Sequence, residues 1–174
     1  MKTFTDSTGR TWTIRLTLGA AMAVKEKLDV DLLQPETPRK DDPDGQPILT
    51  LLGTDEMLLG EVLCALLENQ FEANQVTEAD IRDSFDGQTL LAAQQAFYEE
   101  LVDFFRFRGR NDRAKAVAKQ KALIDAAVEA AETQIDALSV EDTVKGAMKM
   151  ASGGGEMSGG SLAVSGSGQV TSIG

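Results

Sequence analysis

Histidine is absent from this chain of 174 residues, and cysteine occurs once, as Cys64. Histidine is the commonest base near neutral pH and a frequent metal ligand, so its absence removes every Ser–His and Cys–His nucleophile pair. A single cysteine cannot form an intramolecular disulfide, and we expect Cys64 to be a buried structural thiol. These absences favour a protein that is not an enzyme, binds no cofactor or metal, and resides in a reducing cytoplasm.

Long apolar runs are also missing. The most apolar stretch, from Met57 to Leu67, is interrupted by Gly60 and Glu61, whereas a helix needs about 20 mostly apolar residues to cross a bilayer. The formal net charge of −11 opposes general binding to nucleic acids and anionic membranes, because both are negatively charged. We therefore expect no secretory signal, no membrane anchor and no general affinity for polyanions.

Proline is rare and confined to one segment, since all four prolines lie between residues 35 and 47. This spacing opposes both helix and sheet, so residues 34–47 are predicted to form an exposed loop. The acidic residues Asp41, Asp42 and Asp44 lie in the same segment. They lack the ligand spacing of a calcium loop, and we interpret them as solvated.

The first 33 residues predict a β-hairpin followed by a helix. Residues 2–5 and 11–16 are expected to be strands, because Trp12, Ile14 and Leu16 alternate with polar residues. The sequence Asp-Ser-Thr-Gly at 6–9 is typical of the turn between them. Thr17 is expected to cap the following helix.

The rest of the chain predicts a helical body and a flexible tail. Helices are expected from the Thr54-Asp55-Glu56 cap to about residue 70, from 77 to 86, from 88 to 107, from 112 to 138, and from the Ser139-Val140-Glu141-Asp142 cap to about 150. Residues 152–174 contain eight glycines and six serines, too little apolar surface to offset the chain entropy. The predicted fold is mainly α with a small N-terminal β-hairpin. Residues 1–33 and 48–150 would form one domain, followed by a flexible Gly/Ser-rich tail over 151–174.

Two apolar patterns are candidate partner-binding surfaces. One face of the helix over 88–107 carries Phe97, Leu101, Phe104 and Phe105 and is expected to form the wall of a groove. The acidic residues Glu99, Glu100 and Asp103 would form the solvated face of that helix.

The second pattern runs along the helix over 112–138 at spacings of 7, 4, 3, 4 and 3, with Lys121 as an interruption. This seam fits packing against another helix, either to complete the groove or to pair with another copy of the chain. Its members are Val117, Ile124, Val128, Ala131, Ile135 and Leu138.

A basic stretch adjoins both patterns. Between residues 106 and 121 seven basic residues, among them Arg106 and Arg108, are offset only by Asp112, which gives a local formal charge of +6. Three interpretations stay open. The stretch could contact nucleic acid, with Phe104, Phe105 and Phe107 adjoining it for stacking. It could be a solvated surface that complements a helix end. It could also dock an acidic protein partner or the acidic face of another copy of the chain.

The opening of the chain resembles that of tail-assembly chaperones from long-tailed bacteriophages and prophages. The likeness lies in Phe4-x-Asp6-x-x-Gly9-Arg10-x-Trp12, followed by Val24-Lys25-Glu26-Lys27-Leu28-Asp29-Val30-Asp31-Leu32-Leu33. It covers about the first 33 residues closely and the helical body only in general layout.

The resemblance implies a mostly helical, non-enzymatic protein of the host bacterial cytoplasm. It would bind the tape-measure protein, keep its long apolar helices soluble, and help to recruit tail-tube subunits during tail assembly. Self-association through the 117–138 seam is a further expectation. The alternatives are a structural tail or virion subunit and a nucleic-acid-binding helical protein that uses residues 106–121.

Overall fold

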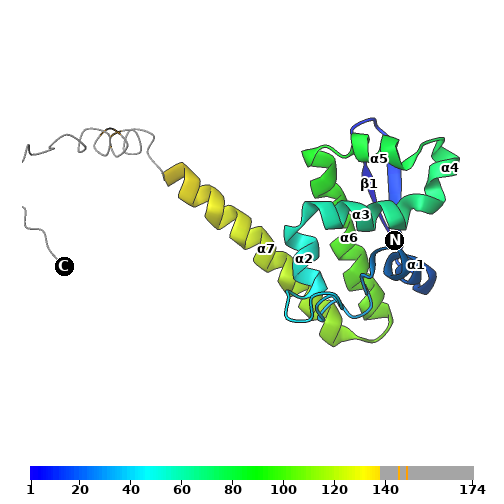
Figure 1. The fold of residues 1–174 in the computed structure, drawn as a ribbon, viewed down its shortest axis with the longest axis horizontal. Helices are drawn as coiled ribbons and strands as arrows, with labels where there is room; N and C mark the ends of the chain where they lie inside the picture. The colour runs from blue at the N-terminus through cyan, green and yellow to red at the C-terminus, as the bar shows by residue number, and fades with distance from the viewer. Residues whose placement is uncertain (138–144, 146–147, 149–174) are drawn as a thin grey trace, which may run out of the picture. The chain divides into compact units, whose positions relative to one another are not determined.

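The computed structural model describes residues 1–137, 145 and 148. Residues 1–130 form one compact unit, and residues 131–174 belong to a second. The described chain is mainly helical with one two-stranded antiparallel sheet at its N-terminus (Figure 1), which confirms the predicted fold class. The elements are β1 (Lys2–Thr5), β2 (Thr11–Ile14), α1 (Leu18–Leu28), α2 (Ile48–Thr54), α3 (Glu56–Leu67), the 3-10 turn η1 (Glu68–Gln70), α4 (Phe71–Asn74), α5 (Glu78–Ser84), α6 (Gly87–Phe107) and α7 (Asn111–Ala137).

The Asp6 carboxylate organises the hairpin turn. Its Oδ1 accepts hydrogen bonds from the Thr8 N–H at 2.9 Å, the Thr8 hydroxyl at 2.7 Å and the Arg10 N–H at 2.9 Å. Its Oδ2 accepts one from the Trp12 indole Nε1–H at 2.9 Å. Gly9 has φ 85°, a conformation that glycine adopts without steric cost. The Asp6-x-x-Gly9-Arg10-x-Trp12 string therefore encodes one hydrogen-bonded turn.

These hydrogen bonds set the acidity of Asp6. Burial alone would raise its pKa, but the hydrogen bonds from the Thr8 and Trp12 side chains and from the Arg10 and Thr8 backbone outweigh burial and lower the pKa from 3.8 to about 2. Because the pKa is lower in the folded state, ionised Asp6 stabilises the fold above its unfolded pKa. That contribution, roughly 2 kcal/mol, is lost as the pH falls through 3.8 toward 2.

Side chains form hydrogen bonds with the backbone of β2 and of the residues after it, on the edge where no described strand pairs with β2. The Gln70 side chain accepts from the Thr13 N–H at 3.0 Å and donates to the Thr13 carbonyl at 2.8 Å. Glu100 of α6 accepts from the Leu16 N–H at 3.0 Å. The strand ends at Ile14, two residues earlier than expected, although Leu16 is still buried as the alternation predicts.

Glu100 corrects the prediction of a solvated acidic face on α6. It is buried, and besides the Leu16 N–H it pairs with the amino group of Met1. Glu99 and Asp103 flank it nearer the surface and pair with Lys2 at 3.4 and 3.1 Å. Three acidic residues in one turn thus include one buried anchor for the hairpin.

Helices enclose the core beside the hairpin, and Figure 1 shows α3 running across α6. α3 is apolar on most of its surface and packs against α1, α2 and α6. Three of the predicted caps are confirmed, because Thr17 accepts from the Ala20 N–H, Asp55 accepts from the Leu58 N–H, and Thr77 forms a capping box with Asp80. Cys64 of α3 is buried as expected, and burial raises its pKa.

The loop over 34–47 is more ordered than its composition indicates. Pro35 is buried, and its carbonyl accepts from the Leu49 N–H at 2.9 Å. Pro38 and Pro47 form an isolated antiparallel bridge, although the spacing of the prolines predicted no sheet pairing. The short helix α2 follows directly and was not anticipated, since Pro47 precedes it without a side-chain cap.

The first turns of α7 pack on α2 and α6. Ala114 and Val117 are buried, and Ile124 is partly buried over Gly53 of α2. A methyl group on Gly53 would lie 2.0 Å from the Ile124 Cδ1 atom, so glycine permits this close approach. The Tyr98 hydroxyl of α6 donates to the Leu49 carbonyl of α2 at 2.8 Å and so fixes α2 against α6.

Two predicted segments lie outside the described residues. They are the final helix after the Ser139 cap and the Gly/Ser-rich tail over 151–174. Leu138, the last member of the predicted seam, also falls there.

We predict that Asp6→Asn lowers the free energy of unfolding by about 1–3 kcal/mol at pH 7, because the amide would leave the buried Trp12 N–H without an acceptor. Urea unfolding followed by the fluorescence of Trp12, the only tryptophan, measures the loss. The gap between wild type and variant should narrow from pH 5 to pH 2, since only the wild type loses an ionised carboxylate. The matched control is Asp44→Asn, the same substitution at an exposed position. A gap that stays constant over this pH range would contradict the assignment.

We predict that Ile124→Ala destabilises the protein by about 1–2 kcal/mol, because its side chain packs over Gly53. Ile135→Ala, the same substitution on the same helix at an exposed position, should change stability by less than about 0.5 kcal/mol. Urea unfolding and limited proteolysis of α7 compare the two variants. Equal losses would show that Ile124 is not the contact that holds α7.

Candidate partner-binding surface

The aromatic face of α6 lies inside the fold. Phe97, Leu101 and Phe105 are buried, and Phe104 is partly buried against the same core. Phe104 and Phe105 make an edge-to-face contact with ring centroids 5.6 Å apart. The groove wall expected at these four residues is therefore not present in this structure, because their side chains fill the core instead of lining a surface.

The helix α6 ends in a turn in which Gly109 has a left-handed conformation, and the Phe107 ring is exposed beside it. The Arg110 N–H donates to the Phe105 carbonyl at 2.8 Å, and the Gly109 N–H donates to the Arg106 carbonyl at 3.0 Å, with Gly109 at φ 72°. This pairing is the Schellman arrangement of a helix C-terminus. Phe107, the last residue of α6, is 86% exposed.

The basic stretch is interleaved with acidic partners. Arg106 donates to Asp103 at 3.0 Å, one turn earlier on α6. Arg110 donates to both carboxylate oxygens of Asp112 at 3.0 and 2.7 Å, and this hydrogen bonding holds the pKa of Asp112 well below its usual value. At the far end of the stretch, Lys121 donates to Asp125 at 2.6 Å.

Arg113 ties the start of α7 to the loop and to α6. It donates to the Leu33 carbonyl at 2.5 Å, pairs with Glu36, and lies 5.8 Å from the centre of the Phe105 ring. A guanidinium over an aromatic face adds a cation–π attraction to these bonds. Arg113 therefore connects the start of α7 to Leu33, Glu36 and α6.

Four of the seven basic side chains thus have acidic partners. Arg108, Lys115 and Lys119 are exposed and carry the remaining positive charge. Of the phenylalanines at 104, 105 and 107, Phe107 alone is exposed. This arrangement favours a solvated, internally paired surface over the continuous cationic and aromatic strip that single-stranded nucleic acid needs.

The apolar seam of α7 divides into a covered and an exposed part. Val117 is buried and Ile124 partly buried, whereas Val128 is 54% and Ile135 is 66% exposed. From Asp125 to Ala137 every residue of the helix is exposed. We call the exposed part of this seam, with its neighbour Leu123, the α7 apolar face, and its members are Leu123, Val128, Ala131 and Ile135.

Leu123 is the member that the seam spacing missed. It is 55% exposed and precedes Ile124, so it lies beside the seam and not on it. The sequence signal for Leu123 is its size and its place directly before Ile124, which puts two large apolar residues in the same turn.

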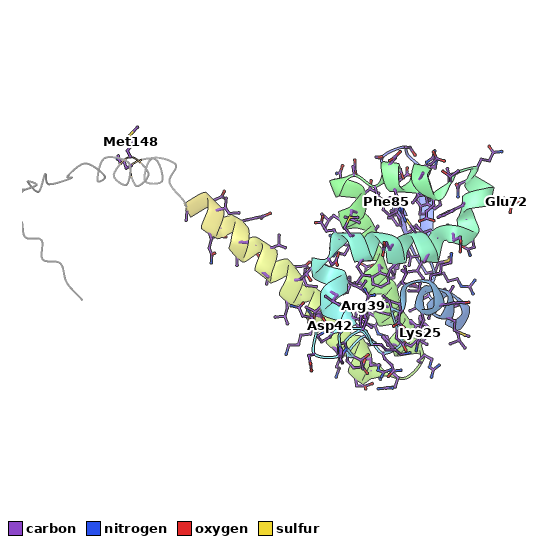
Figure 2. All side chains as sticks on the ribbon, in the orientation of Figure 1. Lys25, Arg39, Asp42, Glu72, Phe85 and Met148 are labelled. Carbon is purple, nitrogen blue, oxygen red and sulfur yellow. The ribbon has the colours of Figure 1, made fainter. Side chains whose placement is uncertain are left out.

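The described part of the chain has several hollows. A hollow of about 390 Å³ lies between β1 and α6, and one of about 90 Å³ lies beside Cys64 and Arg82. Lys25 and Arg39, both labelled in Figure 2, line a third of about 230 Å³. None of the three combines depth with converging catalytic groups.

Among the described residues, no cluster of three or more Cys, Asp or Glu side chains could hold a metal ion. No helix in the described part of the chain is both long and apolar enough to cross a bilayer.

The α7 apolar face is the candidate functional site, because it is an apolar stripe that no described residue covers. Comparison with known proteins adds no assignment, since no family model, no curated protein and no solved structure matches the chain.

Proposed function

We propose that this protein is a tail-assembly chaperone of a long-tailed phage or prophage. It acts in the cytoplasm of the bacterial host, where it binds the tape-measure protein, keeps the apolar helices of that protein soluble and helps to recruit tail-tube subunits. The single observation that carries the proposal is the α7 apolar face, in which Val128 is 54% and Ile135 is 66% exposed on an otherwise regular helix. An exposed apolar stripe at helical spacing is suited to packing against another helix.

The N-terminal string supports the proposal through resemblance. The string Phe4-x-Asp6-x-x-Gly9-Arg10-x-Trp12 resembles that of the chaperone family, and Asp6, Gly9, Arg10 and Trp12 each have a structural task in the turn. A hairpin alone does not require tryptophan at position 12, but here the Trp12 indole N–H donates to the buried Asp6 Oδ2, which also lies 3.6 Å from the Arg10 guanidinium. The string therefore supports a fold in common with that family, and we assign the client-binding role to α7.

The two alternative functions predict different behaviour. A nucleic-acid-binding protein would use the stretch over 106–121, where Arg106, Arg110 and Arg113 already have acidic partners. A structural tail subunit would be found in purified virions, whereas a chaperone leaves the finished particle.

We predict that co-expression with a tape-measure protein moves that protein from the insoluble to the soluble fraction. The paired change Val128→Asp with Ile135→Asp should reduce the soluble client several-fold, because charged side chains oppose burial of the α7 apolar face. The thermal unfolding of the chaperone should stay unchanged, since both residues are exposed. Quantitative electrophoresis of the two fractions gives the readout.

Charge reversal at Arg106, Arg108 and Arg110 is the matched control and should leave most of the protection intact. A steep, salt-dependent mobility shift with DNA or RNA that this reversal abolishes would instead support nucleic-acid binding. If the wild-type protein leaves every tape-measure protein insoluble, the proposed function is wrong.

A further inference from the structure

The α7 apolar face has a strongly acidic surround. Residues 122–137 contain Asp125, Glu129, Glu132 and Asp136 and no lysine or arginine, which gives a formal charge of −4. The preceding stretch over 106–121 carries +6. The change of sign coincides with Ile124, where the seam passes from partly buried to exposed.

The acidic side chains lie where they can select a partner. Asp125 and Glu132 directly follow the seam residues Ile124 and Ala131, and so they flank the seam on one side of the helix. Both are exposed. Asp125 also accepts from Lys121 at 2.6 Å, but an exposed pair of this kind contributes little and can exchange partners.

Small residues allow a second helix to approach this face closely. Alanine occupies position 131 on the seam, between the larger Val128 and Ile135, and position 127 beside it. Two helices pack at 8–10 Å depending on the side chains between them, and alanine favours the shorter distance. The face from Leu123 to Ile135 covers somewhat under four turns, so it suits a short amphipathic helix and a reversible contact.

A second copy of this chain fits the face poorly. Two α7 faces brought together would each carry −4, and like charges across an interface oppose association. An antiparallel offset would place the acidic half of one helix on the basic half of the other. In that basic half the seam residue Val117 and the nearby Ala114 are already buried in their own fold.

We infer that the α7 apolar face docks an amphipathic helix whose apolar stripe is flanked by lysine or arginine. This inference rests on the proposed function and names the chemistry of the client segment. Apolar contacts with Val128, Ala131 and Ile135 supply the affinity, and the acidic flank selects basic helices over acidic ones and speeds their encounter.

The test uses the full-length protein and two synthetic helical peptides. Both peptides carry leucine at the seam positions, and one has lysine and the other glutamate at every flanking position. Fluorescence anisotropy at low and at physiological salt gives their affinities. The lysine-flanked peptide should bind about tenfold more tightly than the glutamate-flanked one, and added salt should narrow the difference.

Two triple variants separate the acidic flank from net charge. Asp125→Lys with Glu132→Lys and Asp136→Lys should reverse the preference between the peptides. The control carries the same change in net charge on the exposed loop, as Asp41→Lys with Asp42→Lys and Asp44→Lys, and should keep the wild-type preference. If the loop variant reverses the preference equally, the selectivity comes from overall charge and the inference is wrong.

The paired change Val128→Asp with Ile135→Asp should weaken binding of the lysine-flanked peptide at least tenfold, and circular dichroism checks that the variant is folded. Equal binding of both peptides by the wild type, or unchanged binding by this variant, would overturn the inference. A dimer of the wild type in sedimentation that this paired change dissociates would also overturn the inference. Failure of the proposed function is distinguishable, because peptides would then bind as expected while tape-measure protein stays insoluble.

Discussion

The hydrogen bond from the Trp12 indole to the Asp6 carboxylate is the constraint on which the N-terminal half depends. It closes the turn between β1 and β2 and turns the Trp12 ring into the core, where it meets Phe71 of α4 edge-to-face at 6.3 Å. On the other strand Phe4 meets Phe85 after α5 in the same manner at 5.7 Å. A two-stranded hairpin is marginal alone, so its stability comes from these helical neighbours. The acidic turn residue thus orients the apolar side chains that join the sheet to the helices.

Local signals were sufficient to predict most elements. The caps Thr17, Asp55 and Thr77 each satisfy helix N–H groups that have no partner within the helix, so short sequences identify helix starts. Gly109 marks the end of α6 in the same way. Features that depend on distant partners were missed. Glu100 has the composition of a surface residue, and only its bond to Leu16 explains its burial. The helix α2 starts after a proline without a side-chain cap and left no such signal.

The candidate site illustrates the same division. Periodicity predicted an apolar seam on α7, but it gives the same spacing for a residue that packs in its own fold and for one that stays exposed. Val117 and Val128 are both valines on this seam, and one is buried while the other is half exposed. Likewise, Phe97 and Leu101 share a face for the ordinary reason that α6 is a core helix. The sequence can locate an apolar stripe. How far the stripe is buried depends on α2, because Gly53 lies against Ile124 and every described residue of α7 after Ile124 is exposed.

The bond between Glu100 and the Leu16 N–H joins residues 84 positions apart. Ribosomes make the chain from its N-terminus, so β2 is synthesised long before the helix that completes its surroundings. The hairpin therefore emerges before α6, and its bond to Glu100 forms only after α6 has been made. α7 follows α6 in the chain, so the elements against which Ala114, Val117 and Ile124 pack are made before it. The exposed half of α7 consequently emerges after the core elements that bury its first half.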